Sequence, residues 1–360
     1  MNRIGKLLGY IVLTINAVSA VLLLVSAYSP YVSPQLFPVV SCLGLFFPFL
    51  LIANLLFLFF WLVVCRRYAL LPLMVMMGCG GMIRTYFPVN GWGEDVPEDA
   101  IKVLSYNTRA FALKASHTRE KSNEVLKYLQ DSDADIICLQ EYIWGGKLKK
   151  KDIDYALRDY PYKHYLSIGK GMNGLGCYSR YPILSANPIP YESNRNGSVA
   201  YRIKAGNDTL LVINNHLESN KILMSDVETY QDMVDAPDSQ KLFAGTRKLM
   251  KKLAEATRIR AYQADAVVKT VKGAKEKHVL VCGDFNDTPV SYTHRVLHEV
   301  LQDAFVESGN GLGISYYHNR LYFRIDHLLA SKNLKVYRCT VDGTVKASDH
   351  YPVWCYISLK

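Results

Sequence analysis

Apolar residues are distributed very unevenly along the chain. Before Glu94 there is no aspartate or glutamate, and Leu, Val, Phe, Ile and Met dominate. Two uncharged runs, Leu7–Tyr28 and Phe37–Cys65, are each long enough to cross a hydrocarbon core of about 30 Å. A third run, Tyr68–Ile83, is shorter, contains glycines, and fits a span, a re-entrant segment or an interfacial segment. This pattern predicts a transmembrane region over residues 1–92, with three helices.

Basic residues flank these runs in a way that predicts an orientation. They fall before the first run and between the second and third runs, at Arg3, Lys6, Arg66 and Arg67. Basic flanks favour the cytoplasm, so three crossings place everything after the third run outside it. If the third run does not span, the remainder of the chain is cytoplasmic instead. A cleaved signal peptide is disfavoured, because the second run follows the first after a short loop.

After Glu94 the chain reads as a soluble domain in which short apolar runs alternate with polar segments. Runs typical of buried strands are Ile101–Tyr106, Ala134–Leu139, Thr209–Asn214, His278–Cys282 and Arg324–Leu329. Apolar residues at helical spacing predict two helices. One covers His117–Gln130, with Ser116 as its N-cap, and the other covers Asp238–Lys272. The elements are compatible with a mixed α/β domain over residues 93–360.

Polar residues follow almost every strand-like run directly. They are Asn107, Gln140, Glu141, Asn215, His216, Asp284, Asn286 and, within or after the last runs, Asp326, Asp349 and His350. A single case is explained by a core strand that reaches a polar loop. Repeated cases are expected when strand ends converge on one functional site. The pattern therefore predicts a single site built from the ends of several strands.

Charge and cysteine content narrow the picture only slightly. The net charge of +10 suits an acidic partner such as nucleic acid, a phosphorylated substrate or anionic lipid, but an ordinary basic surface explains it equally well. The eight cysteines include no CxxC pair, so we expect no zinc site. Cys138 and Cys282 lie in apolar runs and should act as small hydrophobes. A disulfide among Cys177, Cys339 and Cys355 stays open.

In their order along the chain, the motifs LSYN, LQE, NHL, GDFN, RID and SDH resemble those of the endonuclease/exonuclease/phosphatase superfamily. The resemblance runs from about Ile101 to the C-terminus. Members include abasic-site endonucleases, pancreatic-type deoxyribonuclease, inositol polyphosphate 5-phosphatases and neutral sphingomyelinases. The implied fold is a four-layer α/β sandwich, in which two mixed β-sheets are flanked by helices. With its N-terminal spans and the sequence GDFNDTPVSY, the chain also looks like membrane-associated members from Bacteroidetes-type bacteria.

The resemblance implies a Mg²⁺- or Mn²⁺-dependent phosphoesterase. Glu141 is the main metal carboxylate in this interpretation, and Asn107 and Asp349 complete the shell. Oxygen ligands of this kind suit Mg²⁺ or Mn²⁺, which bind through one or two carboxylates and keep several waters.

The remaining matched residues take catalytic roles by the same resemblance. His350 accepts a proton from water or stabilises the phosphoryl charge, and Asp326 accepts a hydrogen bond that fixes the tautomer of His350. Asp284 and Asn286 orient the attacking water and a phosphate oxygen. His216 contacts the phosphate.

Other residues carry weaker or no functional predictions. Some family members place a phosphate-contacting residue before the His216 strand, which makes Arg195 a substrate-binding candidate. His327 stands beside Asp326 on a strand and should point to the opposite face. The other histidines show no partner pattern. Glu218–Gln240 mixes apolar and acidic residues, and forms either a lid, a lipid-facing edge or a packed surface excursion.

Three classes of function compete at this point. The favoured one is a hydrolase acting on a phosphodiester or phosphomonoester. A catalytically inactive, membrane-bound binding module with the same fold is disfavoured, because all the matched site residues are intact. A transporter or channel is disfavoured, because the predicted spans contain no acidic or basic residue.

The sequence does not decide the substrate, because family resemblance alone is a fold-level analogy. Tethering raises the effective concentration of a substrate in or near the bilayer. A phospholipid or sphingolipid head group is therefore slightly preferred over DNA or RNA, which would make the protein a nuclease. The lipid bilayer is the other expected partner, and no obligate protein partner is evident.

Overall fold

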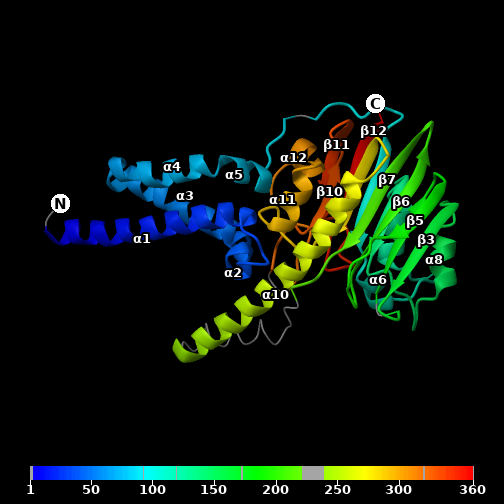
Figure 1. Cartoon of the computed structure of the whole chain (residues 1–360), viewed down its shortest axis with the longest axis horizontal. Coiled ribbons are helices and arrows are strands. Elements are labelled where there is room, and N and C mark those ends of the chain that lie inside the picture. Colours follow the sequence, from blue (N-terminus) through cyan, green and yellow to red (C-terminus); the bar gives the residue numbers. More distant parts are fainter. Residues whose placement is uncertain are drawn as a thin grey trace.

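The N-terminal helices extend as a bundle from one side of a two-sheet α/β sandwich (Figure 1). This computed structural model describes residues 3–91, 93–118, 120–171, 173–220, 239–318 and 321–359. Trp92, where the predicted domain boundary lies, is outside the described residues, and so is the 221–238 part of the segment considered as a lid.

The N-terminal region is helical almost throughout. Its helices are α1 (Arg3–Tyr28), η1 (Ser29–Tyr31), α2 (Pro38–Ser41), η2 (Cys42–Phe46), α3 (Phe47–Val64), η3 (Arg66–Ala69), α4 (Leu70–Gly78) and α5 (Gly80–Tyr86). Two stretches, Gly5–Tyr31 and Pro38–Val64, are long and apolar enough to cross a membrane. The first contains the predicted run Leu7–Tyr28, and the second matches the predicted run Phe37–Cys65 to within one residue at each end. The third run lies in a helix pair, Arg66–Gly78 and Gly80–Tyr86, which is bent by 65° and is either a broken span or a re-entrant loop.

The first sheet has the order β11-β12-β1-β2-β4-β3. Its strands are β1 (Ile101–Asn107), β2 (Ile136–Gln140), β3 (Tyr162–Ile168), β4 (Asn173–Ser179), β11 (Leu334–Val341) and β12 (Val353–Leu359). β1 and β2 are parallel, and the other pairs are antiparallel. The parallel pair needs a crossover, which contains the helix α7 (Glu124–Asp131).

The second sheet has the order β5-β6-β7-β8-β10-β9. Its strands are β5 (Ile183–Pro188), β6 (Gly197–Ala205), β7 (Asp208–His216), β8 (His278–Asp284), β9 (Gln302–Asp303) and β10 (Asp326–Ala330). Here β7 and β8 are the parallel pair, and the long helix α10 (Ser239–Lys272) lies between them in the chain. Each sheet therefore brings the carboxyl ends of two strands to one edge.

Burial of apolar residues explains the four layers. The central core lies between the sheets and includes Val103, Cys138, Val212 and Cys282. A second core packs α7 and α8 (Lys150–Ala156) on the first sheet, and a third packs α10 and α11 (Tyr292–His298) on the second sheet. α12 (Ala304–Ser308) follows β9 and packs near β10 and β11. This is the four-layer sandwich that the resemblance implied.

Several predicted boundaries need correction. The helix predicted over His117–Gln130 begins only at Glu124, because the Asn123 side chain, not that of Ser116, accepts the N-terminal hydrogen bond, from the backbone of Leu126 at 3.1 Å. The SDH motif lies in a loop, and β12 begins only at Val353, directly after a proline that has no N–H to donate. All eight cysteines are free, so the structure contains no disulfide.

Candidate active site

The predicted site residues meet at one edge of the sandwich because both sheets end there. Asn107 ends β1, and Glu141 directly follows β2 in the first sheet. His216 ends β7 and pairs in register with Asp284 at the end of β8. Asp326 begins β10 and pairs with Asp284 from the other side. Strand ends of both sheets thus supply polar groups to a common site, as the sequence predicted.

Asp326 and His350 form a buried hydrogen-bonded pair. Nδ1 of His350 lies 2.8 Å from Oδ2 of Asp326, and the side chains are only 6% and 2% exposed. The Tyr316 ring packs edge-on against His350, with the centroids 5.1 Å apart. Since Nδ1 of His350 faces the Asp326 carboxylate, the other ring nitrogen, Nε2, points toward Asp284. It lies 3.8 Å from Oδ2 of Asp284.

Asp284 lies at the centre of the site. Its Oδ2 atom accepts a hydrogen bond from the side-chain amide of Asn107 at 3.0 Å. Nε2 of His216 is 3.7 Å away from the same oxygen. Its other oxygen accepts from the backbone N–H of Asn286 at 2.8 Å. One carboxylate therefore links residues from three strands and the loop after β8.

Charge within this buried group shifts two pKa values. Burial, together with the nearby Asp326 carboxylate, raises the pKa of Asp284, although His350 opposes the shift. For His350 burial disfavours the charged imidazolium, but Asp326 and Asp284 outweigh it and raise its pKa to about 10. His350 is therefore a cation at neutral pH in the absence of other ligands, and it can stabilise negative charge that develops beside it.

The backbone around Asp284 takes shapes that few residues allow. Gly283 has φ +128°, and a Cβ there would lie 2.0 Å from the backbone oxygen of Asn215 on β7, so only glycine fits. Glu141 and Asn286 both have positive φ, +48° and +52°. Such strain costs about 1–3 kcal/mol per residue and is concentrated at functional sites. The conformations aim both side chains into the same edge of the sandwich.

Glu141, Asn107 and Asp349 are the residues expected to hold a divalent metal ion. The amide nitrogen of Asn107 lies 3.4 Å from Oε1 of Glu141, and Ser348 on the SDH loop donates to the backbone oxygen of Asn107 at 2.8 Å. Asp349 pairs with Arg109 at 3.4 Å. The donor set is oxygen-rich, and the carboxylates of Glu141, Asp284, Asp326 and Asp349 are only partly offset by Arg109 and His350. These residues fit a hard divalent cation such as Mg²⁺.

A cavity of about 1290 Å³ opens beside the site. Glu141 and His216 line it, and so do Lys114 and Arg195. The sequence-based candidate Arg195 therefore faces the cavity region, and its backbone oxygen accepts a hydrogen bond from Asn173 at 2.8 Å. Ile259 of α10 forms part of the wall. The wall thus combines two basic side chains with hydrogen-bonding groups and with the acidic residues Glu192 and Glu218.

Sequence reasoning missed two residues at this site. Asn173, at the start of β4, holds Nδ1 of His216 at 3.0 Å through its amide nitrogen. Arg109 belongs to α6 (Arg109–Lys114), a short turn in which every residue has positive φ. No local pattern signals Asn173. Arg109 stands two residues after Asn107, which is the only signal that could have found it.

Gln140 and Asn214 form a polar bridge between the sheets beneath the site. The Gln140 amide donates to Oδ1 of Asn214 at 2.7 Å, and the Asn214 amide donates to the backbone oxygen of Leu139 at 3.1 Å. Both side chains are fully buried. The bridge fixes the spacing of β2 and β7 where each strand reaches the site.

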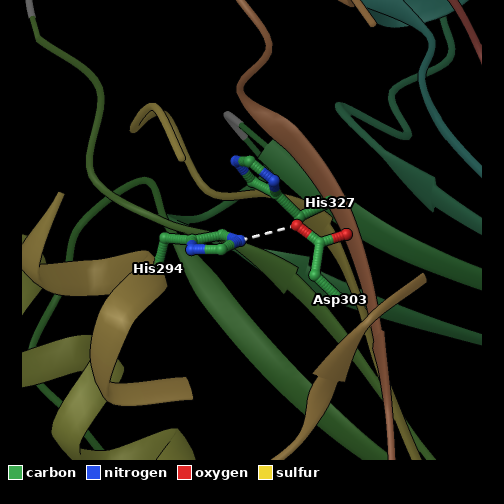
Figure 2. A group of neighbouring side chains, drawn as sticks. All are labelled: His294, Asp303 and His327. Carbon is green, nitrogen blue, oxygen red and sulfur yellow. Dashed lines mark hydrogen bonds and ion pairs between the residues drawn. The ribbon is translucent and has the colours of Figure 1, made fainter. Parts of the chain in front are cut away.

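A second group of buried polar side chains lies on the far side of β10 (Figure 2). His294 from α11, Asp303 from β9 and His327 from β10 converge there, with potential ligand atoms within 4.8 Å of one another. His294 is bound to Asp303 at 2.8 Å, and His327 donates to the backbone oxygen of Asp287 at 2.9 Å. His327 thus points away from the Asp326 face, as predicted, and the group is satisfied by its own hydrogen bonds.

Comparison with protein families gives two matches. The Endonuclease/Exonuclease/phosphatase family profile matches residues 104–350. A domain of unknown function (DUF8431) matches residues 9–86. The comparison with curated proteins gives no match.

Three solved structures with the same fold match this chain over nearly the whole length of the solved chains. The human Nocturnin catalytic domain, solved with a bound sulfate anion, is 16% identical, with a TM-score of 0.53, and the match covers 75% of this chain and 97% of that chain. An endonuclease/exonuclease/phosphatase from Bacteroides vulgatus is 16% identical, with a TM-score of 0.51 and coverages of 72% and 99%. Truncated Caenorhabditis elegans TDP2 is also 16% identical, with a TM-score of 0.50 and coverages of 73% and 99%. These similarities show the fold.

Proposed function

The chain belongs to the endonuclease/exonuclease/phosphatase family of hydrolases, which act on phosphoester bonds and generally depend on a divalent metal, and we propose that it is a membrane-anchored phosphodiesterase. The observation that carries the proposal is the convergence of His350 and the Asp284 carboxylate, 3.8 Å apart, beside an oxygen-rich donor set. An inactive binding module would not need this buried and strained arrangement.

In this proposal Glu141, Asn107 and Asp349 hold a Mg²⁺ or Mn²⁺ ion. When bound, the ion supplies neutralisation of phosphoryl charge and lowers the pKa of water. The amide of Asn107 already lies between two carboxylates, at 3.0 and 3.4 Å. A rotation of this amide would present its oxygen instead of its nitrogen to the ion.

The remaining chemistry falls to the protein's own side chains. Asp284 and Asn286 orient the attacking water, because the carboxylate is held by the Asn286 backbone at 2.8 Å. His350 stabilises the negative charge that grows on the phosphoryl oxygens, while Asp326 keeps its ring in place. His216 offers an Nε2–H group to the phosphate, since its Nδ1 atom is occupied by Asn173. Preorganised donors of this kind contribute much of the rate enhancement in such reactions.

Packing of the N-terminal region supports an extracytoplasmic site with three crossings. The connection between α1 and α3, formed by η1, α2 and η2, contacts α10 and α11 of the sandwich. The Arg66–Arg67 pair lies in η3, between α3 and α4. The bent α4–α5 pair then returns the chain to the sandwich. If the η3 arginines are cytoplasmic, the catalytic domain lies on the other side of the membrane.

For the substrate we prefer a phospholipid or sphingolipid head group, with DNA or RNA as the second candidate. The cavity lined by Lys114 and Arg195 suits a charged group on either. Full-length protein in detergent or vesicles should be compared on short-chain phospholipids, sphingomyelin and plasmid DNA with Mg²⁺. Head-group release supports the preference, whereas DNA cleavage without lipid turnover overturns it and leaves the hydrolytic proposal intact. If the protein hydrolyses none of these substrates and no generic phosphodiester either, the proposed function is contradicted.

A further inference from the structure

Arg324, two residues before Asp326, reaches from the sandwich into the N-terminal helices. Its side chain is 2% exposed and its Nη2 atom donates to the backbone oxygen of Thr85, in the last turn of α5. The guanidinium lies over the Phe305 ring, 4.5 Å from its centroid. Its other nitrogen atoms are buried without a hydrogen-bond partner among the described residues. Among the described residues, the bond to Thr85 is thus the one side-chain hydrogen bond of this buried guanidinium.

Phe323, the residue before Arg324, connects the N-terminal helices to the surroundings of His350. Phe323 packs edge-on against Phe49 of α3, with the ring centroids 6.5 Å apart. On its other side its backbone pairs with Tyr316. Tyr316 in turn forms an isolated bridge with His350 and packs against its ring. Only two residues therefore separate the helix α3 from the imidazole of His350.

The loop after Asn286 contacts the same helical region independently. Val290 is fully buried in a cluster formed otherwise by residues of the N-terminal helices, among them Leu23, Phe47 and Tyr86. A Cβ at Gly44 would lie 1.8 Å from the backbone oxygen of Val290. The two backbones therefore touch, and glycine is required at position 44 by this contact alone, because no positive φ is recorded there.

The segments next to two acids of the site, Asp284 and Asp326, are therefore docked on the N-terminal helices. We propose that these helices are a working part of the active site, in which Arg324 and Gly44 act as positioning residues for Asp326 and for the 284–290 loop. The proposal rests on the proposed function for its kinetic consequences, but the docking itself does not. The active-site residues then keep their catalytic geometry only while the sandwich packs against the N-terminal helices.

Energetics favour positioning over simple stabilisation for Arg324. A buried charge with unsatisfied nitrogens is costly, and replacing such a group by an apolar residue of similar size is often neutral or stabilising. Stability alone therefore does not account for an arginine at this position. The guanidinium does fix the distance between the end of α5 and the strand that begins with Asp326.

Gly44→Ala tests the proposal, with Gly81→Ala as the matched control. Nothing lies within 4 Å of a Cβ at Gly81 on α5, and alanine favours helices over glycine at both positions. Hydrogen exchange of full-length protein in detergent should rise in the 284–290 and 323–327 segments for Gly44→Ala only. With bis(p-nitrophenyl) phosphate and Mg²⁺, its kcat should fall by about 100-fold, the order expected for a displacement near 1 Å, with KM unchanged.

If Gly44→Ala does not fold, Arg324→Met and Arg324→Lys provide a second test of the same docking. Arg324→Met should unfold at the wild-type temperature or above, yet show a lower kcat and faster exchange at 323–327. Arg324→Lys keeps the charge without the planar fork and should recover part of the rate. Wild-type exchange in both segments of a folded Gly44→Ala protein, or wild-type kcat in Arg324→Met, would overturn the proposal. If the wild type does not hydrolyse the probe, the proposed function fails, and the exchange measurement still decides the docking.

Discussion

The amide nitrogen of Asn173 lies 3.0 Å from Nδ1 of His216. The amide oxygen of Asn173 is occupied by the backbone N–H of Gly174 at 2.7 Å, so the nitrogen must face the ring. His216 consequently keeps its proton on Nε2, the atom that faces Asp284. A residue that no motif revealed thus sets the tautomer of a residue that the motifs did reveal.

Replacing Asn173 by alanine should therefore lower kcat while the fold persists. The imidazole of His216 would lose its fixed tautomer, and loss of such an orienting partner typically costs about 10-fold to 100-fold. Steady-state hydrolysis of bis(p-nitrophenyl) phosphate measures the effect. Asn187→Ala, at an exposed position on β5, is the control and should keep the wild-type rate. Equal rates for the two variants would remove Asn173 from the account.

His350→Ala should reduce turnover by about 10²-fold to 10⁴-fold, the range for a positioned acid, base or charge-stabilising imidazole. Asp326→Asn should cause a smaller but still large loss, because it keeps the side-chain shape and removes the charge that holds the ring. His164→Ala, on β3 and away from the site, should stay near the wild-type rate. Circular dichroism would check that each variant is folded. Wild-type turnover in either site variant would exclude that residue.

Much of the sandwich and most of the candidate site could be predicted, because the residues around each strand end carry a signal of their own. The apolar runs that became β1, β2, β7 and β8 were each followed directly by a polar residue. Asp326 and His350 stood in recognisable motifs, and their pairing followed from the family resemblance. Helix ends were less predictable, since the Asn123 side chain that caps α7 is oriented by its hydrogen bonds to the Phe111 and Ala115 backbone oxygens.

Contacts between segments far apart in the sequence could not be predicted. Asn173 opens β4, where glycines interrupt any alternation of apolar and polar residues. The Gln140–Asn214 bridge joins two apolar runs, and nothing in either run indicates its partner. Thr85, the partner of Arg324, lies just beyond a segment whose composition suggests only a membrane helix. In each case packing between layers decides the contact.

His327 should make the protein sensitive to acid. Burial and the nearby His294 and Arg324 lower its pKa to about 3, although Asp303 opposes them. The unfolded chain binds a proton below about pH 6.5, and the folded chain does not. From this residue, the free energy of unfolding therefore falls by up to about 1.4 kcal/mol for each pH unit below that value.

Replacing His327 by glutamine tests this reasoning, because it keeps a donor for the Asp287 carbonyl and removes the titrating ring. The unfolding temperature of full-length protein in detergent should be followed from pH 7 to pH 5. We expect a shallower decline for His327→Gln than for the wild type. Parallel declines would show that His327 does not titrate differently in the two states.

Cysteine labelling can test the proposed topology. Leu36 lies in the connection between α1 and α3 and is 73% exposed. Leu36→Cys and Lys332→Cys, the latter on the sandwich, should both react with a membrane-impermeant maleimide in intact cells. Arg66→Cys should react only after the membrane is opened, because it lies at the other end of α3. Each variant is compared with the unsubstituted protein to subtract native cysteines. Labelling of Leu36→Cys and Lys332→Cys on different sides would contradict the arrangement.

The central claim is metal-dependent hydrolysis of a phosphodiester at the site that contains Glu141, and one measurement addresses it directly. Release of p-nitrophenolate from bis(p-nitrophenyl) phosphate is followed with full-length protein in detergent, first with Mg²⁺ or Mn²⁺, then with EDTA, then with metal restored. The account predicts activity that EDTA abolishes and metal restores, and that Glu141→Gln largely removes while Glu120→Gln, at an exposed position, does not. Full activity in EDTA, or a wild-type rate in Glu141→Gln, would contradict it.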